Sequence, residues 1–295
     1  MSHINNNNFN LATGLDLDVL FECENIGMLN SNLKQTFSFL EAEKYVAIAS
    51  KNDNIKVILV PQNFTHRLEG KILIKVDNPQ KMFFLFFNFL NQLKEKKISE
   101  VSSSSTILGS AIIAKHNVKI GERCFIGENV VINEDVYIED DVIIGSGTII
   151  GGEGLELKKI DNNRMRIVHD KSVFINKNVQ VGSSCVIDKG IYRDTIIGEN
   201  TQIDSLVHIA HACQINKNVI IGSGSIILGS VTIGDNVWIG PNSTISSGIE
   251  IGNDAYIVLG SVVIENVDPG LKISGNFASN HLLHLLNYKQ KKNGK

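Results

Sequence analysis

Two histidines, His208 and His211, lie three residues apart in the second half of the chain. An imidazole has a reference pKa of about 6.5, so it can act as a general base near neutral pH, and its ring nitrogens also bind metals. A zinc site built on this pair would need a third histidine shortly after it, and Asn216 stands there instead. We find no serine, cysteine or threonine nucleophile in a triad pattern. The pair therefore favours acid–base chemistry, with solvent-facing histidines of no special role as the alternative.

The charge and hydropathy of the chain argue against two classes of partner. Its 295 residues carry 28 Lys+Arg against 31 Asp+Glu, without the basic excess expected of a nucleic-acid-binding protein. The longest apolar stretch, 82–90, is far short of the roughly 20 residues that cross a bilayer. The first ten residues lack the apolar core of a signal peptide. We therefore expect no nucleic acid partner and no integral membrane segment.

An aliphatic residue recurs every six positions, without a miss from 197 to 263 and in two earlier runs, 120–150 and 175–187. A smaller or β-branched residue sits two positions before it, and Gly, Asn, Asp or Glu often follows it, as at Gly121, Gly198 and Gly234. A period of six does not match the 3.6 residues of an α-helical turn. A strict repeat of this length predicts a solenoid.

In such a repeat, each unit of six forms one short strand and a corner, and three units form one triangular coil. The aliphatic side chains point inward, and coils stack about 4.8 Å apart. We expect the glycine after the aliphatic residue to serve corners with a left-handed backbone. The sequence thus predicts a mainly β protein, a left-handed parallel β-helix. Residues 151–174 interrupt the repeat as a loop, and residues 188–196 insert four extra positions; such loops often carry binding chemistry.

The two ends of the chain lack the repeat. Strands are expected over 54–60 and 71–76, followed by a phenylalanine-rich helix over 80–96 whose aromatic face packs into a core. After residue 263 we expect a turn and a short helix over 281–288. The predicted domains are a small α/β domain (1–100), the β-helix (101–268) and a C-terminal turn, helix and tail (269–295).

The four cysteines form no C-x-x-C pair. Cys124, Cys185 and Cys213 occupy small-residue positions of the repeat, so packing explains them. Cysteines that serve packing at repeat positions fit a reducing cytoplasm. We therefore expect a cytoplasmic protein.

Three stretches are more specific than the repeat itself: FLEAEKY at 39–45, VIDKG at 186–190 with DTIIG at 194–198, and DSLVHIAH at 204–211. With the order of domains, they make the chain resemble the UDP-3-O-acylglucosamine N-acyltransferases of lipid A synthesis over most of its length. The resemblance implies an acyltransferase that works as a homotrimer with clefts between subunits. It also implies that the N-terminal domain binds a nucleotide, with Phe39 and Tyr45 on either side of the base.

By the same resemblance, His211 is the catalytic base and the backbone N–H of Gly229 binds the oxyanion. The spacing supports this independently, because the two residues are three repeat units apart, which is one full coil and should stack Gly229 over His211. Asp204 would hold the substrate or the histidine, and His208 would contact substrate or orient His211. A thiol is a good leaving group, so acyl transfer from a thioester needs no protein nucleophile.

Three departures shift the expected substrate. Ala42 replaces an asparagine that contacts uracil in the family, Gly248 replaces a second histidine, and the C-terminal helices that engage acyl carrier protein are short. The stretch SGNFA at 274–278 resembles the ending of CoA-dependent hexapeptide acetyltransferases, which implies Gly275 and Asn276 as CoA-binding residues. We therefore expect acyl-CoA as donor and another nucleotide-linked amino sugar as acceptor.

Two alternatives stay open beside this prediction. One is the lipid A reaction itself, with 3-hydroxyacyl carrier protein as donor. The other is a zinc enzyme similar to the γ-class carbonic anhydrases, which share the β-helix; we expect no metal because the third histidine is missing. An ice-binding or scaffolding role is disfavoured because regular threonine ladders are absent from the repeat.

Overall fold

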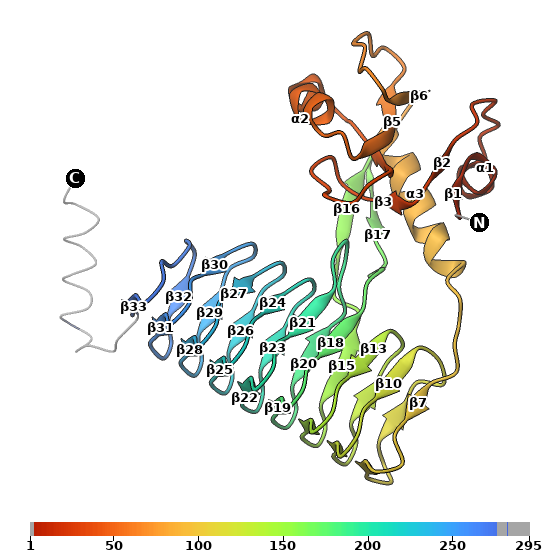
Figure 1. The fold of residues 1–295 in the computed structure, drawn as a ribbon. Helices are drawn as coiled ribbons and strands as arrows, with labels where there is room; N and C mark the ends of the chain where they lie inside the picture. The colour runs from red at the N-terminus through yellow and green to blue at the C-terminus, as the bar shows by residue number, and fades with distance from the viewer. Residues whose placement is uncertain (1–2, 276–281, 283–295) are drawn as a thin grey trace. The chain divides into compact units, whose positions relative to one another are not determined.

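The computed structural model describes residues 3–275 and residue 282 (Figure 1). The chain divides into two compact units. The N-terminal unit comprises Met1–Lys97 and Glu153–Asp170, and the β-helix unit comprises Ile98–Gly152 and Lys171–Lys295. The N-terminal unit thus includes a segment that the repeat pattern alone had grouped with the β-helix.

Within the described residues, the β-helix unit consists of three parallel sheets of eight, nine and eight strands. The first sheet contains β7 (Glu100–Val101), β10 (Val118–Ile120), β13 (Val136–Ile138), β18 (Val173–Ile175), β21 (Thr195–Ile197), β24 (Gln214–Ile215), β27 (Thr232–Ile233) and β30 (Glu250–Ile251). The second contains β8 (Thr106–Ile107), β11 (Phe125–Ile126), β14 (Ile143–Ile144), β19 (Gln180–Val181), β22 (Gln202–Ile203), β25 (Ile220–Ile221), β28 (Trp238–Ile239), β31 (Tyr256–Ile257) and β33 (Lys272–Ile273). The third contains β9 (Ile112–Ile113), β12 (Val131–Ile132), β15 (Ile149–Gly152), β20 (Val186–Asp188), β23 (His208–Ile209), β26 (Ile226–Ile227), β29 (Thr244–Ile245) and β32 (Val262–Val263).

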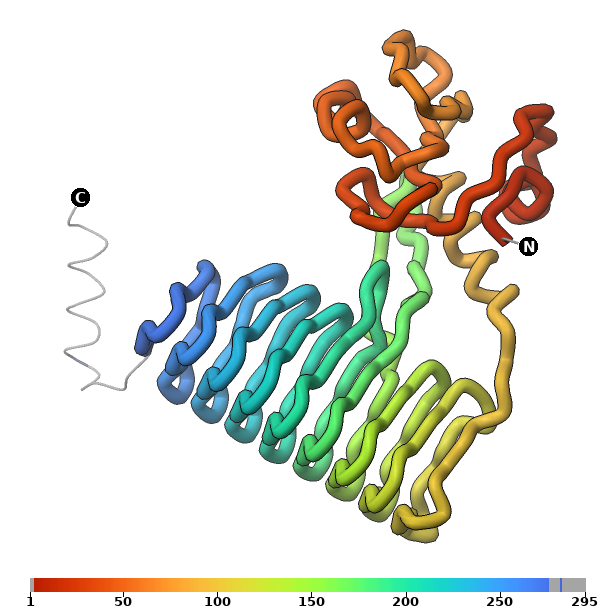
Figure 2. The backbone as a smooth tube through the Cα atoms, in the orientation of Figure 1, coloured from red at the N-terminus to blue at the C-terminus, as the bar shows by residue number. Residues whose placement is uncertain are grey.

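Figure 2 shows the backbone of the stacked coils as a continuous tube. The repeating aliphatic residues form the core inside these coils. Ile209 pairs with Ile227 of the next coil, and both are fully buried. The smaller residues two positions earlier are also buried, as at Cys213 and Val219. The predicted left-handed parallel β-helix is therefore confirmed.

The expected role of the glycines after the aliphatic residues was wrong. Gly198 does not have a left-handed backbone; instead, a Cβ placed on it would lie 2.4 Å from the main chain of Asn216 in the next coil. The left-handed residue comes two positions later, at Asn200 with φ of 60°. Close approach of adjacent coils therefore requires the glycine, and the corner itself is made by the asparagine.

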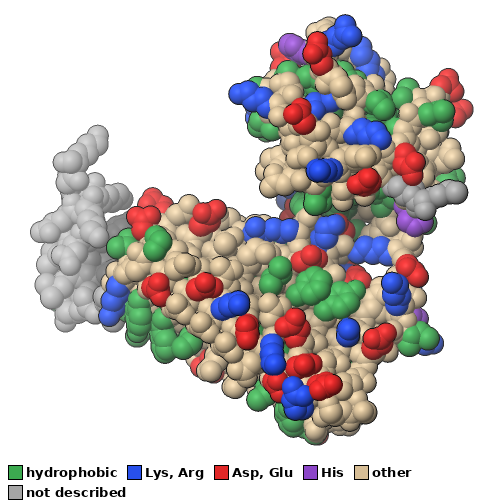
Figure 3. All heavy atoms as spheres, in the orientation of Figure 1, with side chains coloured by type: hydrophobic (Ala, Val, Ile, Leu, Met, Phe, Trp, Pro, Cys, Tyr) green, Lys and Arg blue, Asp and Glu red, His purple; other side chains and the backbone are tan. Residues whose placement is uncertain are grey.

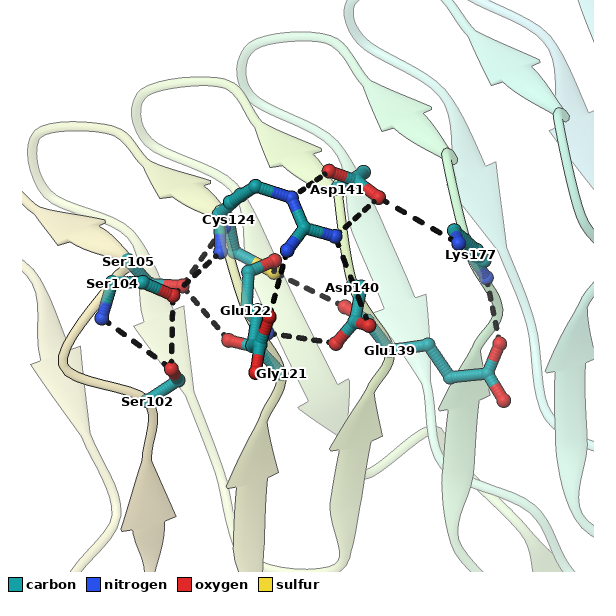
Figure 4. A network of polar contacts seen from close by, with 11 residues as sticks. Ser102, Ser104, Ser105, Gly121, Glu122, Cys124, Glu139, Asp140, Asp141 and Lys177 are labelled. Carbon is teal, nitrogen blue, oxygen red and sulfur yellow. Dashed lines mark hydrogen bonds and ion pairs between the residues drawn. The ribbon is translucent and has the colours of Figure 1, made fainter.

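Polar side chains also link the coils along the corner between the first and second sheets. Arg123 donates from Nε and Nη2 to the two carboxylate oxygens of Asp141, at 2.7 and 2.9 Å (Figure 4). This hydrogen bonding lowers the pKa of Asp141. Further along the same corner, a ladder of side-chain bonds joins Asn178, Asn200, Asn218, Asn236 and Asp254, with donor–acceptor distances of 2.8–3.2 Å.

The N-terminal unit has a four-stranded parallel sheet in the order β3-β4-β5-β6. Its strands are β3 (Asn25–Ile26), β4 (Thr36–Phe39), β5 (Ile55–Pro61) and β6 (Ile72–Val76), and an antiparallel pair joins β1 (Ile4–Asn5) to β2 (Glu22–Cys23). Its helices are α1 (Asn6–Thr13), the 3-10 turn η1 (Glu43–Tyr45), α2 (Val46–Lys51) and α3 (Pro79–Gln92). The predicted small α/β domain with strands over 54–60 and 71–76 is confirmed.

Helix α3 begins where the sequence predicts, because Asn78 caps it by accepting a hydrogen bond from the Lys81 N–H at 2.9 Å. It ends at Gln92, four residues before the predicted end at 96. The predicted core-facing aromatic side is present, since four of its phenylalanines are at most 2% exposed: Phe83, Phe84, Phe86 and Phe87.

The predicted loop over 151–174 contains a β-hairpin instead. Strands β16 (Leu157–Ile160) and β17 (Asn163–Arg166) pair antiparallel. The Asn88 side chain of α3 donates to the carbonyl oxygen of Arg166 at 2.9 Å and accepts from the Val168 N–H at 3.1 Å. The two strands pair with each other and not with a coil of the β-helix, so the six-residue repeat does not reveal the hairpin. The helix predicted over 281–288 lies outside the described residues, apart from Leu282.

Candidate active site

His211 lies at the corner between strand β23 of the third sheet and strand β24 of the first. The next residue, Ala212, has a left-handed backbone with φ of 60° and turns the chain. The carbonyl oxygen of His211 accepts the N–H of Ser230, one coil later, at 2.9 Å. The backbone of His211 is therefore fixed by the stacking of two coils.

The ring of His211 lies directly against Gly229, as the spacing of one coil predicts. A Cβ placed on Gly229 would lie 2.6 Å from both Cε1 and Nε2 of His211. Gly229 does not have a left-handed backbone, so the histidine ring, and not the turn, requires glycine here. The Nδ1 atom of His211 is buried. The Nε2 edge is therefore the edge presented beside the Gly229 backbone.

His208 is held by a residue of the preceding coil, Asp188. Its Nε2 lies 3.1 Å from Oδ2 of Asp188, whose side chain is 7% exposed, against 42% for His208. The hydrogen bond to Asp188 raises the pKa of His208, against the opposing effect of burial. A Cβ on Gly152 would lie 2.6 Å from Oδ1 of Asp188, so this carboxylate also depends on a glycine beneath it.

Asp188 lies in the VIDKG stretch at 186–190, but the sequence pattern does not indicate it as a site residue. The break in the repeat is the signal that could have identified Asp188. Three repeat units after Val186 is Asp204, but Val186 pairs with His208, which is four positions further on. Counting by whole repeats therefore places Asp188 in the wrong register. The dyad of Asp188 and His208 appears only once the insertion is counted.

Asp204 is at a different corner from His211. It follows strand β22 of the second sheet, and its Oδ1 accepts the Ser205 N–H at 2.7 Å. One side of the triangular coil, which contains strand β23, separates the two residues. Six residues at about 3.3 Å each make this side on the order of 20 Å long. Within one chain the structure therefore does not bring Asp204 to His211, and the expectation that it holds this histidine is not met there.

Asp204 instead lines a groove of about 620 Å³ on the second sheet. Gln202, Ile220 and Trp238 line the same groove. The side chains of Ile220 and Trp238 are 37% and 36% exposed, which is high for residues of this size. The groove is therefore mainly apolar with one carboxylate at its edge.

Phe39 and Tyr45 meet at a pocket of about 290 Å³ within the N-terminal unit. Phe39 is 6% exposed and packs against Phe83 with ring centroids 4.6 Å apart, so it forms the floor. Tyr45 is partly exposed, and Lys44 Nζ lies 4.9 Å from its ring centroid. Asn30 and Glu41 add polar groups to the lining. The two aromatic residues selected from the sequence thus share one pocket.

The predicted CoA-binding pair falls at the edge of the described chain. Gly275 has no other atom within 4 Å of where its Cβ would be. Asn276 lies outside the described residues. Their role stays a prediction.

Two further observations concern only the described parts of the chain. None of their helices has the length and apolar character needed to cross a bilayer. Among the same residues, no group of three or more His, Cys, Asp or Glu side chains could hold a metal ion. On the face shown in Figure 3, acidic and basic side chains are interspersed, without a stripe of one sign.

Comparison with known proteins points to one family. The family description "Bacterial transferase hexapeptide (six repeats)" matches residues 117–152, 194–229 and 230–265, and the second match contains both His211 and Gly229. UDP-3-O-acylglucosamine N-acyltransferase of Campylobacter curvus is 36% identical over 228 residues, which cover 70% of this chain and 71% of that protein. The chain belongs to this family of hexapeptide-repeat acyltransferases.

Other similarities are more local or concern the fold alone. The enzyme of the same name from Leptospira biflexa is 38% identical over 82 residues, 28% of this chain, and the match spans only 23% of that relative's length. A solved UDP-N-acetylglucosamine acyltransferase of Francisella novicida superposes with a TM-score of 0.51 at 23% identity. It covers 65% of this chain and 72% of that one, which supports the β-helix fold.

The dyad of His208 and Asp188 predicts a pH-dependent stability. Because the folded-state pKa of His208 is raised above its unfolded value of about 6.5, the dyad stabilises the fold below that pH and stops doing so as the pH rises through the folded pKa. Asp188→Asn should therefore lower the melting temperature more at about pH 5.5 than at about pH 8.5, by roughly 1–3 °C for a pair this exposed.

The control for this measurement is Asp204→Asn, which alters a carboxylate that lies at another corner. Its melting-temperature difference from wild type should not grow between about pH 8.5 and about pH 5.5. Equal losses for Asp188→Asn at both pH values would contradict the coupling of His208 to Asp188.

Proposed function

We propose that this chain is an N-acyltransferase that transfers an acyl group from a thioester to the amino group of a nucleotide-linked amino sugar. The observation that carries the proposal is the stacking of the Nε2 edge of His211 on Gly229, whose Cβ position would be 2.6 Å away. A base beside a backbone N–H is the pair of groups that acyl transfer needs. Membership of an acyltransferase family supports the same reaction.

In the proposed reaction, the sugar amine attacks the thioester carbonyl carbon while Nε2 of His211 takes a proton from the nitrogen. The carbonyl oxygen becomes an oxyanion, which the N–H of Gly229 stabilises; one such donor is worth about 3–4 kcal/mol. Collapse of the tetrahedral intermediate restores the C=O double bond, now of an amide, and breaks the C–S bond. The released thiolate takes the proton back from His211, which restores the base.

The acceptor is proposed to place its nucleotide base in the pocket of the N-terminal unit. Phe39 and Tyr45 supply aromatic surface, and Asn30 supplies an amide that can both donate and accept hydrogen bonds. With Ala42 in place of the family asparagine, Asn30 is the amide in this pocket available to read a pyrimidine. A UDP-linked acceptor is supported by the Campylobacter curvus relative.

Two donor and acceptor pairs fit this site, and each has its own support. The relatives' name favours UDP-3-O-acylglucosamine as acceptor, and the resemblance to the lipid A enzymes adds a 3-hydroxyacyl carrier protein as donor. Ala42, Gly248 and the SGNFA stretch at 274–278 favour a different nucleotide-linked amino sugar and acyl-CoA. We give the first pair precedence because the similarity covers 70% of the chain, whereas the departures are two single positions and one short stretch.

We also propose a homotrimer in which a second copy covers the groove on the second sheet. Large apolar side chains on this face are 36–43% exposed, at Ile143, Ile220, Trp238 and Tyr256. Surfaces of this kind commonly mark interfaces between proteins. Because Asp204 lines the groove, a neighbouring copy seated there would place Asp204 at the interface, where it could serve the neighbour's acceptor.

The assembly has a direct test in light scattering at micromolar concentration. We expect a mass of about 97 kDa, three times the chain mass of 32.4 kDa. Trp238→Glu should shift the mass toward the monomer because it buries a charge in an apolar contact, whereas Trp238→Phe should leave it unchanged. A wild-type chain that scatters as a 32.4 kDa monomer would refute the trimer.

The catalytic pair predicts that His211→Ala lowers kcat by roughly 10²–10⁴-fold, the usual range for a general base. Gly229→Ala should lower kcat comparably, because its methyl group would push the ring away from the reacting amine. His116→Ala and Gly109→Ala are the matched controls; Gly109 has no atom within 4 Å of its Cβ position and no left-handed backbone. Near-wild-type turnover of His211→Ala would show that the base lies elsewhere.

A thiol-release assay with matched pairs separates the two substrate proposals. One arm contains 3-hydroxyacyl carrier protein and UDP-3-O-acylglucosamine; the other contains short-chain acyl-CoA and UDP- or dTDP-linked amino sugars. We expect turnover in the first arm. Turnover confined to the second arm would reverse the order of the two proposals, and no thiol release in either would refute the acyltransferase proposal.

A further inference from the structure

The insertion at 188–196 lies in the same corner column as His211 and Gly229. It connects β20 of the third sheet to β21 of the first, and His211 and Gly229 each follow a strand of the third sheet and precede a strand of the first. The register confirms the extra length, because the step from Val186 to its partner His208 is four positions longer than the step from His208 to its partner Ile226. The insertion therefore neighbours the coil that carries His211.

The insertion is a compact structure with defined contacts. A Cβ on Gly190 would lie 2.0 Å from the carbonyl oxygen of Arg193, so the loop folds tightly back on itself. Ile191 is 3% exposed and forms a β-bridge to Arg193. Asp194 accepts the Ser172 N–H at 2.8 Å. The position of Arg193 is therefore set by the loop.

From this loop the guanidinium of Arg193 spans two coils. Nε donates to the carbonyl oxygen of Ala212 at 2.8 Å, and Nη2 donates to the carbonyl oxygen of Ser230 at 2.9 Å. Ala212 directly follows His211, and Ser230 directly follows Gly229. A planar guanidinium holds its donors at a fixed spacing, so one side chain braces the two corners, which the bond from the Ser230 N–H to the His211 carbonyl oxygen also joins.

Both clamped residues are the left-handed corner residues, with φ of 60° at Ala212 and 64° at Ser230. Neither is a glycine or an asparagine, the residues that tolerate this conformation best, so each corner carries some backbone strain. Thr195 adds a third bond by accepting the Ala212 N–H at its Oγ1, at 2.9 Å. The insertion thus stabilises the strained turns that orient His211 and Gly229.

We propose that Arg193 is a positioning residue that keeps the His211 base and the Gly229 N–H in mutual register. The proposal rests on the function proposed above. Arg193 acts by fixing the geometry of the two groups. A misplacement of about 1 Å between reacting groups can lower the rate by about 10²-fold. Arg193 contacts the corner carbonyl groups and takes no part in proton transfer.

The kinetic test compares Arg193→Gln, Arg193→Lys and wild type. We expect Arg193→Gln to lower kcat by about 10²-fold while the KM for the sugar changes little, since the pocket for the nucleotide is unaltered. Arg193→Lys should recover little, because a single ammonium group cannot reproduce the fixed fork that spans both carbonyls. Arg123→Gln is the matched control, since it removes a corner arginine that is bonded to Asp141 and should keep wild-type kcat. Unchanged kcat in Arg193→Gln would overturn the proposal.

A second readout is independent of turnover. Diethyl pyrocarbonate modifies exposed imidazoles, and mass spectrometry gives the rate at each histidine of the substrate-free protein. Loosening the corner should speed the modification of His211 in Arg193→Gln while leaving His116 at its wild-type rate. Equal His211 rates in both proteins would overturn the proposal. A wild-type protein without turnover would refute the acyltransferase function but would leave this comparison valid.

Discussion

The stacking of one coil on the next by backbone hydrogen bonds is the constraint on which the rest of the structure depends. It makes every residue of the regular repeat the neighbour of the residue three repeat units later, and it brings adjacent main chains so close that Gly198 has no room for a Cβ. Chemistry on such a scaffold has to be assembled along a column. His211 and Gly229 are two successive members of one column, which is why the ring of His211 packs on the backbone of Gly229 without any loop between them.

This same constraint explains how much could be predicted from the sequence. A strict period fixes the sheets, the buried aliphatic positions and the stacking of Gly229 on His211, since all three follow from counting along the chain. The hairpin of β16 and β17 could not be found this way, because its strands pair with each other and lie outside the six-residue repeat. The bond between Asp188 and His208 was missed because it crosses the coil in which the count gains four positions.

Each corner makes two different physical demands, which fall on two positions of the repeat, and the sequence pattern did not separate them. Glycines after the aliphatic residue are needed for room between coils, while left-handed turns two positions later are made by residues such as Asn200, Ala212 and Ser230. An asparagine tolerates that backbone and can also bond to the next coil, as the ladder through Asn200 does. Ala212 has no polar side chain, and at the corners of Ala212 and Ser230 the guanidinium of Arg193 bonds to the backbone carbonyl groups instead.

The location of the insertion follows from the same logic. Four extra residues within a strand would shift the register of every later pair, whereas at a corner they leave both flanking strands paired. Val186 still pairs with His208, and Thr195 still pairs with Val173 of the coil before. A corner is thus the place where a β-helix can gain polar groups such as Asp188 and Arg193 while its core stays intact. A side chain added at a corner reaches only the coils stacked next to it. Because the insertion lies in the same corner column as the proposed catalytic pair, Arg193 can contact the two coils that carry His211 and Gly229.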